Sequence, residues 1–299
     1  MLFAAVGASL IEKAAMARLA RFRGIPTLLF PRGAEVIQTF RSSRWAKIWL
    51  RWVFRSSDLV LCQGAAWQRF LIDDLHLLPE RVPIILNWTA TSALLAIGNG
   101  RTYNERLEGT QLLFLGWLER EKGIFELLQA CSRLVASHQF RLRIAGRGHA
   151  EKEARQFVEA GPLAGRVEFV GWIQDDVRNQ ILANSDVLIL PSYAEGFPNA
   201  IIEAMAAGLA VIVTAVGNVP DVLTHEQEVL LVPPKDTSAL ENSLKRILDD
   251  VDLRHKLSLR GHEFAKNHFS VEPAAANLSA AIRLAMVLRN MNQESGLRK

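Results

Sequence analysis

Short apolar runs separated by helical patterns fill the second half of the chain. Apolar runs occupy 186–192 and 210–215, and the segment 200–207 between them has the apolar spacing of a helix that Gly208 would cap. Short apolar runs that end in turn residues are typical of buried parallel strands. The pattern therefore predicts a strand–helix–strand unit. Its connecting loop lies at the carboxyl end of a strand, where open α/β sheets bind their ligands.

The same alternation predicts elements along the rest of the chain. Strands and helices alternate from Gln111 to about Asn267. Outside this region we expect a helix over 11–23, strands over 26–30, 59–62 and 82–86, a helix near 65–74 and a last helix over about 273–291. The segment 87–106 lacks periodicity and contains Gly98-Asn99-Gly100, which indicates a linker. The chain is therefore predicted to have an α/β fold.

The composition is typical of a globular protein, with 299 residues of which 49% are hydrophobic. No run of eighteen apolar residues occurs, so we expect no membrane-spanning helix, and the start of the chain does not resemble a signal peptide. Cys62 and Cys131 lie in apolar or helical contexts, which indicates buried thiols in a reducing compartment. The seven histidines form no cluster with metal-ligand spacing, so no metal is expected. These features predict a cytoplasmic protein.

The net charge of +4 conceals an uneven distribution. Residues 1–98 carry 12 Lys and Arg against 6 Asp and Glu, whereas residues 99–282 carry 19 against 24. A basic N-terminal part is expected to face an anionic surface, either a membrane or a nucleic acid. No nucleic-acid-binding motif accompanies the charge, so the membrane is the preferred interpretation.

Two glutamates, Glu195 and Glu203, bracket the loop of the strand–helix–strand unit in the segment Glu195-Gly-Phe-Pro-Asn-Ala-Ile-Ile-Glu203. We expect Glu195 on the loop and Glu203 in the first turn of the next helix, with Asn199 as the candidate N-cap. A helix start offers unpaired N–H groups to a phosphate, and carboxylates suit the hydroxyl groups of a ribose or a sugar. The segment therefore indicates a sugar-nucleotide site; by spacing alone, two solvated surface charges are the alternative.

The segment 191–217 resembles the signature of retaining GT-B glycosyltransferases of family four, which build bacterial polysaccharides and lipopolysaccharides. Four further segments at 113–123, 142–148, 167–173 and 229–234 are similar to other motifs of this family and follow in the same order. The resemblance implies a GT-B fold with two Rossmann-like domains built on parallel sheets. It also implies a nucleotide-sugar as donor substrate and no further cofactor.

The resemblance also implies roles for individual residues. Glu203 would accept hydrogen bonds from the ribose, Glu195 would contact the transferred sugar, Lys122 would bind the donor phosphates, and backbone atoms at Ile173 would read the base. The remaining positions implied in donor binding are Gly116, Gly146, Gly148, Gly196, Phe197, Pro198, Asn199 and Ala200. An exposed helix lysine is the alternative for Lys122.

The chain departs from the family pattern at two places near the expected phosphates. Trp117 stands where the family has an arginine between Gly116 and Leu118, and Arg120 either replaces that cation or faces solvent. Arg32 stands where many members have a histidine near the reacting sugar. We expect Arg32 to act on the sugar or phosphate; an ion pair with Glu35 is the structural alternative.

The N-terminal half is short for this family. We expect a partial acceptor-side domain over 1–98, a donor-binding domain over 99–272 and a C-terminal helix over 273–299 that crosses back to the first domain. A whole Rossmann-like domain needs roughly 150 residues. By the family pattern we expect the first strands and their glycine-rich loop to be missing, so that the chain would be a fragment or mis-started product, or else a reduced member of the family.

The segment 44–55 predicts an amphipathic helix with Trp45, Ile48, Trp49, Trp52 and Val53 on one stripe. Tryptophan with Lys and Arg on such a helix suits the surface of an anionic membrane. The alternative is that the stripe packs into the core of its own domain.

Together the motifs predict a retaining, metal-independent hexosyltransferase that uses a nucleotide-sugar and a glycan or lipid-linked acceptor, at the cytoplasmic face of the cell membrane. The leading alternative is a catalytically degenerate protein that binds a sugar nucleotide or a partner without turnover. A GT-B epimerase or phosphorylase fits less well, because no pyridoxal-phosphate lysine site is recognisable and an epimerase needs no membrane-facing basic helix.

Overall fold

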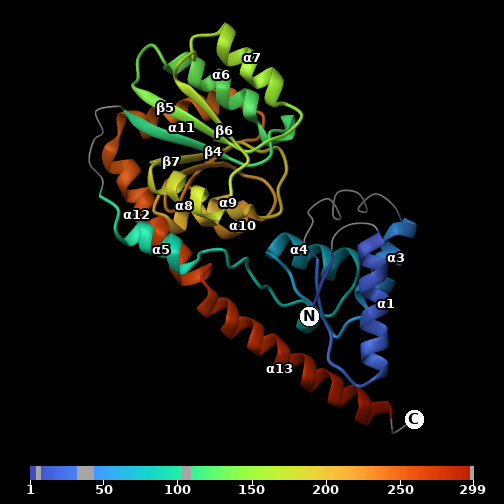
Figure 1. The fold of residues 1–299 in the computed structure, drawn as a ribbon. Helices are drawn as coiled ribbons and strands as arrows, with labels where there is room; N and C mark the ends of the chain where they lie inside the picture. The colour runs from blue at the N-terminus through green and yellow to red at the C-terminus, as the bar shows by residue number, and fades with distance from the viewer. Residues whose placement is uncertain (5–7, 32–43, 103–108, 297–299) are drawn as a thin grey trace. The chain divides into compact units, whose positions relative to one another are not determined.

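The computed structural model describes residues 1–4, 8–31, 44–102 and 109–296 (Figure 1). The chain divides into two compact units, one formed by Met1–Asn87 with Glu272–Lys299 and the other by Trp88–Val271. Residues 88–98, which the sequence assigns to the first domain, therefore belong to the second unit. Arg32 and Glu35 lie outside the described residues.

The first unit contains a parallel sheet in the order β1-β2-β3. The strands are β1 (Leu2–Ala4), β2 (Leu28–Pro31) and β3 (Leu59–Val60). The helices of this unit are α1 (Ala8–Phe22), α3 (Arg44–Phe54), α4 (Ala65–Arg69) and the long α13 (Val271–Gly296). A π-helical turn at Phe70–Asp74 follows α4, and a 3-10 turn lies at Pro79–Arg81. The first residue of α13, Val271, belongs to the second unit. The predicted strand over 82–86 is wrong in extent. Only Ile84 bridges to Cys62, because Pro83 has no N–H to extend the ladder.

A buried carboxylate ties together the edges of this first unit. Asp58 accepts hydrogen bonds at 2.8 Å from both the backbone N–H and the hydroxyl of Thr27, and its other oxygen lies 3.1 Å from Arg21 Nε. Arg289 of α13 lies 3.9 Å from the same oxygen and also bonds to the carbonyl oxygen of Arg21. A buried charge is tolerated only with such partners, so Asp58 fixes the strand ends and the C-terminal helix to one another.

The second unit is a six-stranded parallel sheet in the order β6-β5-β4-β7-β8-β9. Its strands are β4 (Thr110–Leu115), β5 (Phe140–Ala145), β6 (Val167–Gly171), β7 (Val187–Leu190), β8 (Ala210–Thr214) and β9 (Leu230–Val232). Helices cover both faces (Figure 1): α5 (Ser92–Asn99), α6 (Ile124–Leu134), α7 (Glu151–Ala160), α8 (Asp175–Ala183), α9 (Asn199–Ala206), α10 (Val219–Val222), α11 (Thr237–Asp249) and α12 (Val251–His268). The strand order reverses between β4 and β7, which is where sheets of this type bind ligands.

The predicted strand–helix–strand unit is confirmed in β7, α9 and β8, with two corrections at the helix. Pro198, with φ −66° and ψ 129°, occupies the N-cap position, and Asn199 is already helical. Glu203 is consequently in the second turn of α9 rather than the first. Gly208 ends the helix as predicted: its φ is 71°, and its N–H and that of Leu209 bond to the last turn.

The predicted linker over 87–106 contains the helix α5, so this prediction is wrong for residues 92–99. The Thr91 hydroxyl caps the helix by accepting a hydrogen bond from the Leu94 N–H at 3.3 Å. Gly98 allows α5 to lie directly on α9, because an added Cβ would overlap the carbonyl oxygen of Ala206 and the ring of His262. The glycine that suggested a flexible linker is therefore a packing residue.

Within the described residues, one helical stretch passes the length and composition test for crossing a membrane. It spans Val251–Asn290 and contains an 18-residue window of mean hydropathy 1.3, of which 17% is buried. This finding differs from the expectation that no segment of the chain is long and apolar enough to span a membrane. A single such helix is weak support for a membrane span, because core helices of soluble proteins pass the same test.

Both cysteines are buried and free, as predicted. Burial raises the pKa of the Cys62 thiol and that of the Cys131 thiol to about 12.

The packing of α5 makes a prediction about stability. Gly98→Ala should lower the free energy of unfolding by about 1–3 kcal/mol, because the new methyl group meets backbone that must move. Gly100→Ala is the matched control, since the nearest atom to its Cβ is 3.5 Å away. Chemical denaturation of both variants checks this. Equal losses in the free energy of unfolding for the two variants would mean that α5 does not pack against α9 as described.

Candidate active site

The loops that follow β4, β5 and β6 are joined by close backbone contacts. The Gly116 N–H bonds to the Ala145 carbonyl at 3.0 Å, and the Gly146 N–H bonds to the Gly171 carbonyl at 2.8 Å. A Cβ on Gly146, whose φ is 147°, would overlap the Gly116 carbonyl, and one on Gly148 would overlap that of Leu118. The structure thus brings Gly116, Gly146 and Gly148 together at the carboxyl edge of the sheet, and the close approach requires glycine at Gly146 and Gly148.

The loop between β7 and α9 is fixed in the same way. A Cβ on Gly217 would overlap the carbonyl of Glu195, and the Asn218 N–H bonds to the Gly196 carbonyl at 2.9 Å. The Phe197 ring is buried and lies 5.3 Å from the ring of Phe269. Gly196 and Phe197 are therefore held by neighbouring segments rather than left as an open loop. Pro198, Asn199 and Ala200 follow directly and form the start of α9.

Lys122 and Glu195 meet across the point where the strand order reverses. Lys122 follows β4 on a short 3-10 turn (Arg120–Lys122), and Glu195 follows β7. Lys122 Nζ lies 2.6 Å from Glu195 Oε1, with both side chains largely buried. Gly123 makes this approach possible, because a Cβ there would overlap the carbonyl of Pro191. Two residues 73 positions apart in sequence thus form one ion pair.

Glu203 projects from the second turn of α9 and is only 12% exposed. Its Oε1 lies 3.3 Å from Nη1 of Arg178, and Nη2 of that guanidinium lies 3.1 Å from Asp175. Burial raises the pKa of the Glu203 carboxyl, and Arg178 opposes this rise, while Asp175 adds slightly to it. No sequence motif marked Arg178. It stands 25 residues before Glu203, in a helix whose periodicity gives no reason to single it out.

Two residues near the expected phosphates do not join the Lys122–Glu195 pair. Arg120 is exposed, bonds to Glu153 of α7 at 2.5 Å and lies over the ring of Phe125. Trp117 is 56% exposed and packs against Trp172, itself 58% exposed, with ring centroids 5.1 Å apart. This exposed tryptophan pair was not predicted, since its members follow different strands.

Ile173 follows Gly171 and Trp172 in the loop after β6 and is half-buried. Its position places it at the same carboxyl edge as Gly116 and Gly146.

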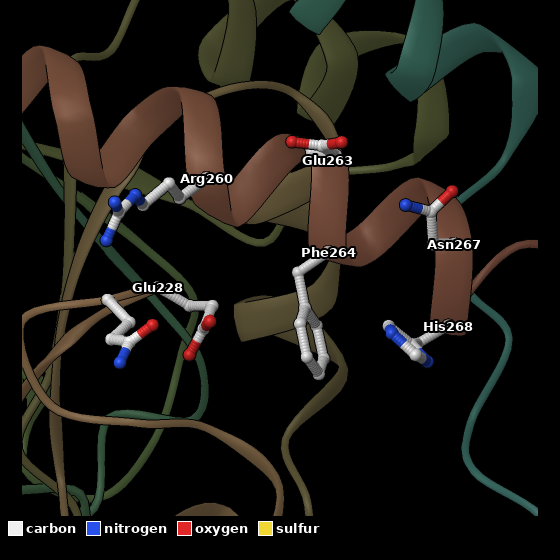
Figure 2. Close-up of a pocket in the computed structure, with 7 residues that line it drawn as sticks. Glu228, Arg260, Glu263, Phe264, Asn267 and His268 are labelled. Atoms are coloured by element: carbon white, nitrogen blue, oxygen red, sulfur yellow. The ribbon is translucent and has the colours of Figure 1, made fainter.

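An open pocket of about 260 Å³ lies elsewhere on the second unit (Figure 2). Arg260, Glu263, Phe264, Asn267 and His268 project into it from α12, facing Glu228 of the segment before β9. None of the predicted site residues lines this pocket. The described residues include no group of three or more His, Cys, Asp and Glu that would hold a metal.

Comparison with known proteins identifies what the second unit resembles. The family model described as glycosyl transferases group 1 matches residues 101–264. The lipopolysaccharide core biosynthesis glycosyltransferase LpsE of Rhizobium meliloti is 28% identical over 221 residues, which is 73% of this chain and 62% of that protein. The phosphatidyl-myo-inositol mannosyltransferase of Mycolicibacterium smegmatis is 36% identical over 159 residues, or 52% and 40% of the two chains. The matches thus span less than two thirds of each relative.

A solved structure shares the fold. Anabaena Alr3699/HepE, determined in complex with UDP and glucose, superposes with a TM-score of 0.75 at 18% identity, covering 94% of this chain and 77% of that one. The two parallel sheets and this likeness confirm the predicted α/β GT-B fold.

The close approach at Gly146 makes a prediction about the site. Gly146→Ala should destabilise the protein more than Gly165→Ala, because both positions have positive φ but only Gly146 also faces a backbone carbonyl. The difference in the free energy of unfolding between the two variants should be at least about 1 kcal/mol. Chemical denaturation provides the measurement. Equal destabilisation would show that the loops can separate without cost.

Proposed function

Since the chain belongs to the group 1 family of glycosyl transferases, we propose that it moves a hexosyl group from a nucleotide-sugar to a glycan or lipid-linked acceptor with retention. The observation that supports this most directly is the Lys122–Glu195 ion pair at the reversal of strand order, with Glu203 on the adjoining helix. An ammonium group at this edge can bind a diphosphate, and the two carboxylates can accept hydrogen bonds from the hydroxyl groups of a sugar and a ribose.

Transfer requires stabilisation of the diphosphate leaving group as negative charge builds on it. In this proposal Lys122 and the N–H groups at the start of α9 supply the positive potential without a metal. Lys122 is bound to Glu195 in the present structure, so the arriving phosphate exchanges one anionic partner of Lys122 for another. Glu195 is then released to accept hydrogen bonds from the hydroxyls of the transferred sugar.

Retention fits attack from the face that the leaving group occupies, with a donor phosphate oxygen taking the proton of the acceptor hydroxyl. The described residues need to supply only orientation and charge for this step. The proposed roles are sugar contact for Glu195, ribose contact for Glu203 and base contact for the backbone at Ile173.

The relatives support the choice of substrates. The Anabaena structure holds UDP and glucose, and the Rhizobium relative is described as acting in lipopolysaccharide core biosynthesis. We accordingly propose a nucleotide-sugar donor and a lipid-linked or growing glycan acceptor at the cytoplasmic face of the membrane. Binding of a sugar nucleotide without turnover is the second candidate, favoured by Trp117 in the arginine position and by the engagement of Arg120 with Glu153.

The donor site is tested by calorimetry with UDP, GDP and ADP. We expect at least one to bind, and Glu203→Gln to weaken that binding about tenfold, because charge-assisted hydrogen bonds to the ribose are lost. Glu195→Gln should abolish sugar transfer without weakening nucleotide binding, because the uncharged amide competes less with the donor phosphates for Lys122.

Glu168→Gln, on the exposed end of an ion pair with Arg143, is the control and should change neither quantity. Absence of binding to all three nucleotides would contradict the donor site. Nucleotide binding without transfer to any acceptor would favour the non-catalytic candidate.

The helix α3 supports a contact with an anionic membrane. Leu50, Val53 and Phe54 are buried in the first unit, whereas Trp45, Ile48 and Trp52 are 83%, 59% and 52% exposed. The predicted single apolar stripe is thus divided. Its buried residue packs in the core of the first unit, and we propose that its exposed residues contact lipid. The segment 44–55 has four basic and no acidic residues, so the exposed tryptophans are accompanied by positive charge.

The neighbouring helix α1 holds one of these tryptophans in place. The Arg18 guanidinium lies 3.4 Å from the centre of the Trp52 ring and donates a hydrogen bond to the Trp52 carbonyl at 2.8 Å. The cation is thereby held beside an indole ring that solvent reaches, an arrangement suited to the lipid headgroup region.

Binding to lipid vesicles tests this surface. Trp45→Ala combined with Trp52→Ala should lower the affinity for vesicles of phosphatidylcholine and phosphatidylglycerol at least fivefold, because two interfacial side chains are lost. Trp172→Ala, an equally exposed tryptophan of the other unit, is the control and should bind like the parent. Sedimentation with vesicles gives the measurement. Parent-like binding by the double variant, or no preference for anionic lipid, would contradict the proposal.

A further inference from the structure

Arg178 links the acidic start of α8 to the buried carboxylate of α9. Its guanidinium lies between Asp175, at 3.1 Å, and Glu203, at 3.3 Å. The Asp175 side chain is 85% exposed, so that contact is in solvent and contributes little. The contact with Glu203 is largely buried, because the two side chains are only 25% and 12% exposed. Arg178 Nε is itself buried and has no hydrogen-bond partner among the residues that the structure describes.

Burial disfavours the ionised form of the Glu203 carboxyl, and the Arg178 cation favours it. Transfer of a carboxylate out of water is costly unless an opposite charge or hydrogen bonds replace the lost solvation. Among the described residues, Arg101 and His262 also lie beside α9, but they do not replace Arg178 as a partner of Glu203. Both are bound to backbone carbonyls near the end of α9. Asp175 is the other charged group that acts on Glu203, and its charge opposes ionisation.

The ionised form matters for the proposed role of Glu203. An ionised carboxylate offers acceptor sites on both oxygens to two ribose hydroxyls, whereas a protonated carboxyl gives up one acceptor position for a donor. Hydrogen bonds to the ionised group are also roughly twice as strong. Loss of the charge would therefore weaken ribose binding even with the side chain in place.

We propose that Arg178 is a positioning residue of the donor site, which keeps the Glu203 carboxylate charged and oriented toward the ribose hydroxyls of a nucleotide. The inference rests on the proposed function, since it requires that Glu203 contact the donor. Arg178 itself need not touch the nucleotide. A purely structural role is a weak explanation for the pair, because a buried ion pair adds little to stability compared with apolar packing.

The test compares nucleotide affinity as a function of pH in the parent, Arg178→Gln and Arg178→Lys, with whichever of UDP, GDP and ADP binds the parent. Arg178→Gln removes the charge that lowers the pKa of the Glu203 carboxyl, so this pKa rises. Affinity is lost as pH falls through that raised pKa, and the fall should begin about one pH unit higher than in the parent. In the pH interval between the two falls, the variant should bind up to about tenfold more weakly than the parent. Arg178→Lys restores a positive charge and should shift the profile back toward the parent.

Arg133→Gln is the matched control, since it removes an arginine from an exposed pair with Glu241 on the same unit. It should leave the affinity and its pH profile unchanged. Arg178→Gln should have little further effect when Glu203→Gln is already present, because the group on which it acts has been replaced.

The outcomes separate this inference from the proposed function. If the parent binds none of the three nucleotides, the proposed function fails and the inference with it. If the parent binds but Arg178→Gln keeps the parent affinity and pH profile, the inference alone is overturned. It is also overturned if Arg178→Gln and Glu203→Gln weaken binding additively, because the two side chains would then act independently.

Discussion

Backbone segments at the carboxyl edge of the six-stranded sheet approach one another so closely that no side chain fits between them. Gly123 lies against the carbonyl of Pro191, Gly146 against that of Gly116, and Gly217 against that of Glu195. These contacts fix the loops after β4, β5, β7 and β8 relative to one another. The pairing of Lys122 with Glu195 depends on them, because each residue stands on a loop that a glycine allows to approach its neighbour. A preorganised arrangement of charge is what stabilisation of a leaving diphosphate requires.

Each unit contains a largely buried carboxylate that is paired with an arginine. Asp58 receives two hydrogen bonds from Thr27 and an ion pair from Arg21. Within the described parts of the chain, Glu203 pairs instead with one cation, Arg178, and burial still raises its pKa. Asp58, whose side chain is 3% exposed, suits a structural role, whereas the Glu203 side chain is 12% exposed and keeps some access for a ligand.

The helix α3 shows how a single amphipathic pattern can serve two surfaces. Its periodicity marks one stripe, but packing buries Val53 and leaves Trp45 and Trp52 in solvent. Arg18 of α1 packs on the face of Trp52 without burying it. A helical period identifies an apolar side, and only the neighbouring elements determine how much of that side they cover.

Local pattern determined the elements around the site and the family motif. The strands β7 and β8, the helix between them and the Gly208 cap follow from apolar spacing and from the backbone freedom of glycine, which neighbouring residues specify by themselves. The tertiary structure decided the helix α5 in the expected linker, where contact with α9 outweighs the weak signal of Gly98. It also decided the partners of Lys122 and Glu203, because these contacts form only after the strand order has brought loops and helices distant in sequence side by side. Local spacing cannot encode such distances, and for that reason Arg178 had no sequence signal.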